Sequence, residues 1–136
     1  MSGTAGVNMK TIFVVDDDQD YCEVTQLRLE GAGYRVVIAH NGEEALELLN
    51  GSFRPDLIIM DTCMPVKDGV SALINLNAQG SRKNRDPKGR IPVLVVTGLA
   101  SERLEEIVKQ LDANDFLQKP FDAEQLITKV RNIIGK

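Results

Sequence analysis

The stretch "FVVDDDQD", residues 13–20, runs from apolar residues directly into a cluster of acids. Three apolar side chains, which belong in a buried strand, are followed by Asp16, Asp17 and Asp18, with Asp20 close behind. Two unit charges about 4 Å apart repel each other by roughly 4 kcal/mol at an effective dielectric constant near 20. Carboxylates crowded at the end of a buried strand must therefore point into water or share a cation.

Four further apolar runs follow along the chain, and with this one they predict five strands. Most are continuously apolar and rich in Val and Ile, which is typical of strands buried on both faces of a parallel sheet. They occupy residues 11–15, 34–39, 56–60, 92–96 and 115–117.

The segments between these runs carry apolar residues at helical spacing. Strands that alternate with helices imply crossover connections and helices on both faces of the sheet. The sequence therefore predicts an α/β fold with a doubly wound, five-stranded parallel sheet and five helices. The stripes are Leu104-Ile107-Val108-Leu111, Leu126-Ile127-Val130-Ile133-Ile134, the shorter Ala45-Leu48-Leu49 and Val70-Leu73-Ile74, and the weaker Tyr21-Val24-Leu27.

The 136 residues, 43% hydrophobic and 26% charged, have the composition of one globular domain. No apolar run reaches the roughly 20 residues that span a bilayer, and no secretory signal is recognisable. Cys22 and Cys63 are the only cysteines, which fits a reducing compartment, so we expect a cytoplasmic protein with no membrane partner. Residues 1–9 are predicted to be a disordered leader or an expression remnant, and residues 10–136 the folded domain.

The net charge of −4 is unevenly distributed. Segment 81–90, "SRKNRDPKGR", has five basic residues and one acidic residue, so it carries +4 and the rest of the chain −8. An acidic body argues against direct contact with nucleic acid, which requires a basic face. The basic segment lies in a long connection, at about 78–91, and is either a solvated insertion or a docking element.

Polar residues stand where four of the predicted strands end. Asp16 and Asp17 follow the first strand, Asp61 the third, Thr97 the fourth and Lys119 the fifth. Ligands of open α/β sheets bind beyond the carboxyl ends of the strands, so we expect these side chains to converge. Carboxylate oxygens and water are the ligands that Mg²⁺ prefers, and the acids therefore predict a magnesium site.

Four segments resemble the signature motifs of response-regulator receiver domains, the CheY-like phospho-acceptors of two-component signalling. They are "FVVDDDQD" (13–20), "LIIMDTCMPVKDG" (57–69), "VLVVTG" (93–98) and "DFLQKPF" (115–121), at four strand ends in the family's order. The resemblance covers residues 10–136 and implies a (βα)5, flavodoxin-like fold. It also implies a histidine kinase or a histidine phosphotransfer protein as the phosphodonor.

By the same resemblance, Asp61 is the residue that is phosphorylated. Mg²⁺ is then held by Asp17, Asp61 and the backbone carbonyl of Cys63, with Asp16 contributing through a water molecule. Attack of a carboxylate on a phosphoryl group needs a metal to neutralise charge and a further cation for the transferred group. The acids and their predicted metal fit that requirement.

The resemblance assigns Thr97 and Lys119 to the transferred group, as a hydroxyl that binds a phosphoryl oxygen and an ammonium that pairs with the phosphate. Thr97 and Phe116 are the implied switch residues, and the Lys119–Pro120 bond resembles the family's cis peptide. Phosphorylation is expected to repack the face made by the fourth helix, the fifth strand and the fifth helix. An unknown downstream protein is expected to bind that face.

Other acidic or phosphate-binding motifs do not fit. An EF-hand loop from Asp16 needs Gly and Glu where the chain has Tyr21 and Leu27, and a haloacid-dehalogenase-type phosphatase needs Thr or Val in place of Asp20. The chain has no GxxxxGK[ST] loop. A phosphorylation-independent scaffold with the same fold stays open, and a phosphatase is a weaker option. A receiver domain is not expected to turn over an external substrate, and whether this one acts alone or within a longer protein stays open.

Overall fold

The computed structural model describes residues 9–51, 53–61, 91–98 and 114–135. All five predicted strands are present in these ranges, each within one residue of the expected bounds. The elements are β1 (Thr11–Val15), α1 (Gln19–Gly31), β2 (Arg35–Ala39), α2 (Gly42–Asn50), β3 (Leu57–Asp61), β4 (Val93–Thr97), β5 (Asp115–Gln118) and α5 (Ala123–Ile134).

Several predicted segments lie outside the described residues. These are the helices expected around 70–74 and 104–111, the basic segment 81–90, and the leader apart from Met9. Within the described ranges, no helix is both long enough and apolar enough to cross a lipid bilayer.

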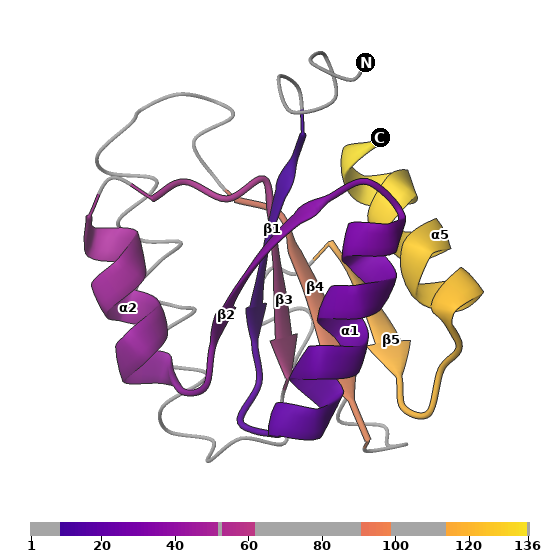
Figure 1. Ribbon diagram of the computed structural model, residues 1–136, viewed down its shortest axis with the longest axis horizontal. Helices are drawn as coiled ribbons and strands as arrows, with labels where there is room; N and C mark the ends of the chain where they lie inside the picture. Colours follow the sequence, from indigo (N-terminus) through magenta and orange to yellow (C-terminus); the bar gives the residue numbers. More distant parts are fainter. Residues whose placement is uncertain (1–8, 52, 62–90, 99–113, 136) are drawn as a thin grey trace.

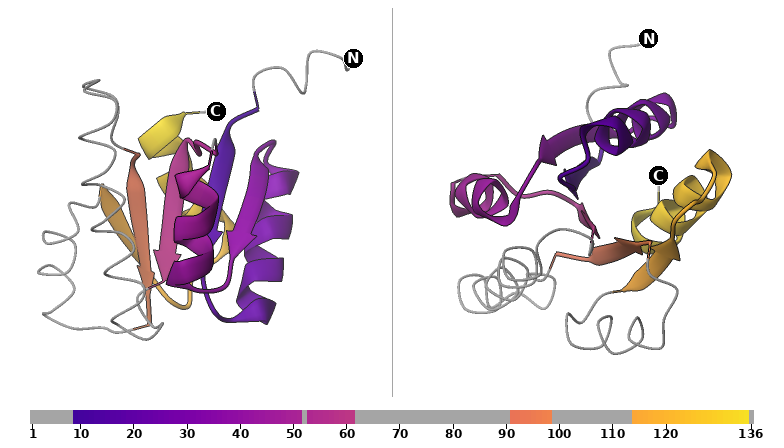
Figure 2. Two further views of the ribbon diagram at one scale, coloured as in Figure 1. Left: turned by 90° about the vertical axis from the view of Figure 1, so that its left-hand side faces the viewer. Right: turned by 90° about the horizontal axis from the view of Figure 1, so that it is seen from below.

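The five strands form one parallel sheet in the order β2-β1-β3-β4-β5 (Figure 1). The chain moves outward from β1 to β2 and then returns past β1, so that β3 lies on the other side of β1. Figure 2 shows α1 and α5 on one face of the sheet and α2 on the opposite face. The doubly wound parallel sheet predicted from the sequence is confirmed. Its strand order reverses between β1 and β3, and this reversal opens a crevice at their carboxyl ends.

Each buried strand contributes to two cores, because successive side chains point to opposite faces of the sheet. Phe13 of β1 packs on the α2 side, in one cluster with Leu49. Its neighbour Ile12 packs on the other side, in one cluster with Leu29 of α1 and Leu126 of α5. None of these side chains is more than 5% exposed. This two-sided burial explains why the strands read as continuous apolar runs.

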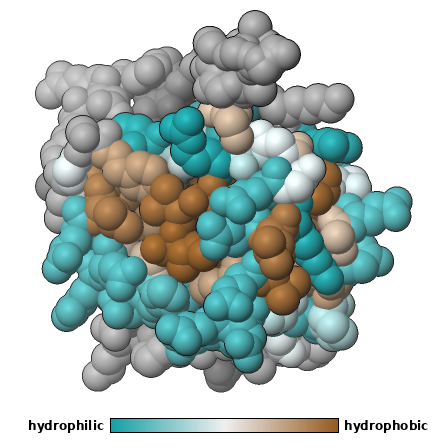
Figure 3. Space-filling model, in the orientation of Figure 1, coloured by the Kyte–Doolittle hydropathy of each residue, from teal (hydrophilic) through white to brown (hydrophobic). Residues whose placement is uncertain are grey.

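The apolar stripe predicted for α1 is wrong. The helix buries Cys22, Thr25 and Leu29, whereas Val24 and Leu27 of the predicted stripe are 44% and 70% exposed. Two of the buried side chains, Cys22 and Thr25, are small, so the buried face of this helix has only a weak hydrophobic pattern in the sequence. Figure 3, in the same orientation as Figure 1, shows that hydrophobic residues reach the surface of the molecule among hydrophilic ones.

Each described helix begins at a side chain that caps its first turn. The Asp18 carboxylate accepts a hydrogen bond of 3.1 Å from the backbone N–H of Tyr21, and Asn41 caps α2 in the same way. At α5, Asp122 and Gln125 cap each other's backbone N–H groups. Such caps are typically worth about 1 kcal/mol each. Asp18, one acid of the stretch 13–20, is therefore the N-cap residue of α1.

The last turn of α5 is tied to the amino ends of the strands. Lys10 Nζ donates to the backbone oxygen of Ile134, and the Tyr34 hydroxyl donates to the backbone oxygen of Gly135 at 2.8 Å. Lys10 and Tyr34 immediately precede β1 and β2. They satisfy carbonyls that a helix leaves without intrahelical partners at its end, and so hold α5 along the length of the sheet.

Leu29 and Leu27 offer a matched test of which face of α1 is buried. We expect Leu29→Ala to lower the free energy of unfolding by about 2–5 kcal/mol, because it removes buried atoms and leaves a cavity. Leu27→Ala should change that free energy by less than about 0.5 kcal/mol. Urea unfolding followed by circular dichroism measures both values, and equal losses would contradict this orientation of α1.

Candidate functional site

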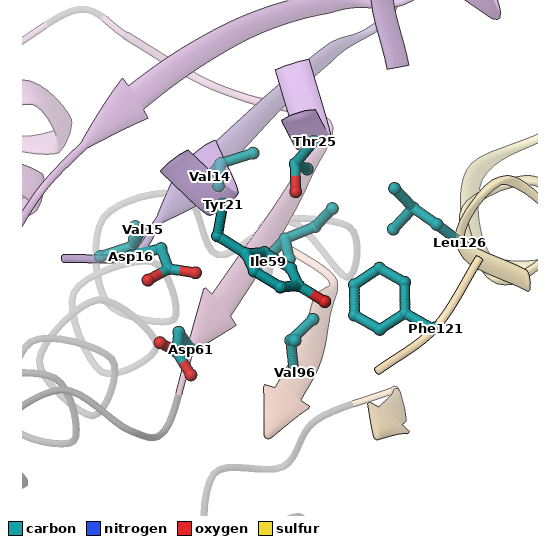
Figure 4. Close-up of a pocket in the computed structure, with 10 residues that line it drawn as sticks. All are labelled: Val14, Val15, Asp16, Tyr21, Thr25, Ile59, Asp61, Val96, Phe121 and Leu126. Carbon is teal, nitrogen blue, oxygen red and sulfur yellow. The ribbon is translucent and has the colours of Figure 1, made fainter. Parts of the chain in front are cut away.

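Three carboxylates meet where β1 and β3 end. Asp16 and Asp17 follow β1, Asp61 is the last residue of β3, and one oxygen atom of each lies within 4.8 Å of the others. Asp16 and Asp61 are 4% and 2% exposed, whereas Asp17 lies at the surface. Figure 4 shows the carboxylates of Asp16 and Asp61 side by side at the edge of a small cavity. The predicted convergence of these acids is present in the structure.

Backbone hydrogen bonds hold Asp16 in place. Its N–H donates to the Ala39 carbonyl at 3.0 Å, beyond the last β1–β2 pair, and its Oδ1 accepts from the Asp18 N–H at 2.9 Å. The Cys22 thiol donates to the Asp16 carbonyl at 3.3 Å. Burial raises the pKa of Cys22 to about 12, so the thiol is neutral, as expected of a residue that packs the helix against the sheet.

Burial also raises the pKa of Asp16 from 3.8 to about 6, and the Asp61 charge adds to the rise. The Asp18 N–H and the Lys119 ammonium act in the opposite direction. Because the pKa is raised by folding, the stability associated with protonated Asp16 is complete below pH 3.8 and is lost as the pH rises through about 6. The ionised cluster therefore destabilises the fold at neutral pH, and a bound cation would offset that cost.

The ammonium of Lys119 lies against two of these carboxylates. Its Nζ is 3.4 Å from Asp61 Oδ2 and 3.5 Å from Asp16 Oδ2. Burial lowers the pKa of Lys119, but the charges of Asp61 and Asp16 outweigh it and raise the pKa above its ordinary value. The Lys119 N–H donates to the Thr97 carbonyl at 2.7 Å, and the predicted cis bond to Pro120 is present. Lys119 is therefore charged and held at the site.

The two predicted switch residues differ in their exposure to solvent. Thr97 is the last residue of β4 and is 1% exposed, at the same sheet edge as the acids. Phe116 of β5 is 37% exposed, and the Nζ of Lys129 lies 5.9 Å from its ring centroid. Phe116 thus faces outward in this structure. The predicted ligand carbonyl of Cys63 lies outside the described residues.

One side chain at this site, that of Tyr21, is not among the predicted site residues. Its ring centroid is 4.0 Å from Lys119 Nζ, and the ring meets Phe121 edge to face at 5.6 Å. In the sequence, Tyr21 falls in the apolar stripe Tyr21-Val24-Leu27. Its position in the first turn after the acids was the available signal, because that turn begins beside the carboxyl end of β1.

The donor set fits a divalent cation that prefers oxygen ligands. Three carboxylates approach one another closely, and two of them are buried. The Lys119 ammonium contacts Asp16 and Asp61, and the Asp18 N–H donates to Asp16. Carboxylate oxygens with one exposed ligand, Asp17, suit Mg²⁺, which retains several water ligands.

Comparisons with known proteins bear on this arrangement. Residues 12–131 match the family model described as "Response regulator receiver domain". The transcriptional regulatory protein CpxR of Escherichia coli (strain K12) is 34% identical over 128 residues, which cover 94% of this chain and 50% of CpxR. The chain thus spans about half the length of that relative.

Two solved structures are similar to this one over almost their whole length. The Vibrio cholerae chemotaxis protein CheY4 has a TM-score of 0.79 and 30% identity, covering 92% of this chain and 98% of CheY4. The receiver domain of the Pseudomonas aeruginosa PAO1 sensor histidine kinase PA1611, with magnesium coordinated in its active site cleft, has a TM-score of 0.77 and 30% identity, covering 94% and 99%.

The family match spans most of the chain, and both its sequence relative and its structural neighbours reach 30% identity. The resemblance carried by the four strand-end motifs is confirmed. This chain belongs to the family of response regulator receiver domains.

Proposed function

We propose that this chain is a phospho-acceptor switch in which Asp61 takes a phosphoryl group from a histidine kinase or a histidine phosphotransfer protein. The observation that carries the proposal is the setting of Asp61. Its carboxylate is 2% exposed at the end of β3, lies beside Asp16 and Asp17, and is 3.4 Å from the Lys119 ammonium.

In the proposed step, a carboxylate oxygen of Asp61 attacks phosphorus and forms a new P–O bond. The P–N bond of the donor phosphohistidine breaks, and the leaving nitrogen retains the electron pair. Lys119 balances the charge of the transferred oxygens, and the Thr97 hydroxyl donates to one of them. Positioning and charge neutralisation supply most of the catalysis in phosphoryl transfer, and these two side chains stand at the strand ends next to Asp61.

We propose that Asp17, Asp61 and the Cys63 carbonyl hold Mg²⁺, with Asp16 reached through a water molecule. When bound, the metal supplies neutralisation of the phosphoryl oxygens. The close approach of the three carboxylates supports this assignment, as does the magnesium ion in the cleft of the similar PA1611 receiver domain.

We further propose that phosphorylation draws Thr97 toward the new group and lets Phe116 turn inward. The Thr97 carbonyl accepts from the Lys119 N–H, so movement at the end of β4 is coupled to the end of β5. The outward, 37% exposed position of Phe116 is compatible with the unphosphorylated arrangement. A downstream protein would then distinguish two packings of the face formed by the fourth helix, β5 and α5. The fourth helix lies outside the described residues.

We propose a cytoplasmic switch that does not turn over an external substrate. CpxR is named a transcriptional regulatory protein and is about twice as long as the matched region, so the comparisons give no support to the prediction that nucleic acid is not contacted. That prediction rests only on the acidic charge of this chain.

Phosphorylation of Asp61 separates this function from that of a scaffold with the same fold. With Mg²⁺ and a small phosphodonor such as acetyl phosphate, we expect the intact mass to rise by one phosphoryl group. The product should be stable in acid and cleaved by hydroxylamine, as an acyl phosphate is. Asp61→Asn should gain nothing. A wild-type chain that gains no phosphoryl group would support the scaffold instead.

Mg²⁺ should stabilise the chain by binding the folded state. At a concentration about 100 times its dissociation constant, a ligand adds roughly 2.7 kcal/mol to the free energy of unfolding, which thermal melts with and without Mg²⁺ detect. Asp17→Asn should abolish the rise in melting temperature. Asp20→Asn is the matched control, because Asp20 is exposed in the first turn of α1 and outside the acid cluster. An undiminished Mg²⁺ response in Asp17→Asn would remove the metal assignment.

Thr97→Ala should accept the phosphoryl group without transmitting the signal. We expect phosphorylation of the wild type to change hydrogen exchange across β5 and α5, and expect no such change in phosphorylated Thr97→Ala. Thr11→Ala, at the amino end of β1, is the control and should behave as the wild type. If phosphorylated Thr97→Ala responds like the wild type, Thr97 is not the switch.

A further inference from the structure

The face of the Tyr21 ring lies next to the Lys119 ammonium. Tyr21 stands in the first turn of α1, three residues after the capping Asp18, and its ring centroid is 4.0 Å from Lys119 Nζ. A lysine ammonium within about 6 Å of an aromatic centroid is attracted by the negative face of the ring. Lys119 therefore has a contact that does not involve the carboxylates.

The carboxylates alone hold this ammonium loosely. Its distances of 3.4 Å to Asp61 and 3.5 Å to Asp16 are long for charge-assisted hydrogen bonds, which are typically about 2.7–2.9 Å. A lysine side chain carries about 2 kcal/mol of rotamer entropy and presents only a point charge. The side chain of Lys119 is nevertheless only 16% exposed. The Tyr21 ring supplies the further contact that limits where Nζ can lie.

The ring itself is held from two sides. Its neighbour Cys22 anchors α1 in the core at 1% exposure. Phe121 meets the ring edge to face, with the planes at 72°, and the Phe121 carbonyl accepts from Arg28 Nη1 at 3.4 Å. Figure 4 shows the Tyr21 ring between Asp16 and Phe121. The segment that carries Lys119 thus also braces the ring that contacts Lys119.

The contact depends on the ring and not on the hydroxyl. Within the described residues, the Tyr21 hydroxyl makes no hydrogen bond with a protein group. Burial raises its pKa above the ordinary value, so the side chain is a neutral phenol at physiological pH. An unsubstituted phenyl ring at this position would offer Lys119 a similar face.

We propose that Tyr21 is a positioning residue of the phospho-acceptor site, whose ring face holds the Lys119 ammonium against Asp16 and Asp61 before the phosphoryl group arrives. The proposal rests on the function proposed for Asp61 and adds a residue that the four strand-end motifs do not assign. Without the ring, Lys119 visits more positions, and the cation is less often in place when transfer begins.

The first test measures phosphorylation rates with acetyl phosphate at saturating Mg²⁺. We expect Tyr21→Phe to stay within about twofold of the wild type, and Tyr21→Leu to be about threefold to tenfold slower, from the usual strength of such contacts. Phenylalanines carrying one, two or three ring fluorines at position 21 preserve the shape while weakening the negative face. The rate should fall steadily along that series, which a packing role alone would not produce.

The second test needs no phosphorylation. In the absence of donor and Mg²⁺, an amine-reactive reagent should label Lys119 about twofold to fivefold faster in Tyr21→Leu than in Tyr21→Phe, as read by peptide mass spectrometry. Lys129 is the internal control, because it pairs with Asp115 at 3.0 Å and does not depend on Tyr21. Its labelling should be the same in both variants. Urea midpoints verify that the variants are folded.

The outcomes distinguish the two proposals. If the wild type gains no phosphoryl group, the function of Asp61 is wrong, and the labelling result still decides whether the ring restrains Lys119. If the wild type is phosphorylated but the fluorinated series has constant rates and Lys119 labelling is unchanged in Tyr21→Leu, Tyr21 does not position the ammonium. Should Tyr21→Leu fail to fold, the fluorinated series decides alone.

Discussion

The buried carboxylates of Asp16 and Asp61 repel each other, and this repulsion determines which charged groups the site needs around them. Both groups stand at strand ends where the core closes, and Asp17 adds a third negative charge on the solvent side. Within the described residues, the Asp18 N–H and the Lys119 ammonium compensate part of this charge. The remaining imbalance makes the site receptive to a cation. The same imbalance hinders an incoming phosphoryl group unless a cation is already in place.

The order of the strands creates this crowding. Asp16 and Asp61 are separated by α1, β2 and α2 along the chain, but β1 and β3 pair directly, with Val15 opposite Met60. In an antiparallel pair the carboxyl ends of the two strands lie at opposite edges of the sheet. Because all five strands are parallel, every strand brings its carboxyl end to one edge, and Lys119 arrives there from the last strand. The parallel pairing of the strands is thus what brings site residues from distant segments of the chain together.

The fold was largely predictable because its strands are buried on both sides, which leaves continuous apolar runs with polar residues at their ends. The acids, Thr97 and Lys119 could be located for the same reason. The orientation of α1 could not, because its buried face includes Cys22 and Thr25, whose small side chains give a weak hydrophobic signal. The contact between Tyr21 and Lys119 also depends on side-chain directions across two elements far apart in sequence. Periodicity carries no information about such a contact, and it likewise does not reveal that Phe116 faces outward.

The hydrogen bonds from Lys10 and Tyr34 to the end of α5 bear on how this chain could be used as a tool. They hold Gly135 at the amino ends of the strands, and a five-residue strand is about 17 Å long. A fluorescent reporter or a surface anchor joined after residue 135 would start at the edge of the sheet opposite Asp61. Tagged or immobilised chains would then keep the acidic edge open to solution, which suits the chain to optical or surface-based sensing of phosphodonors.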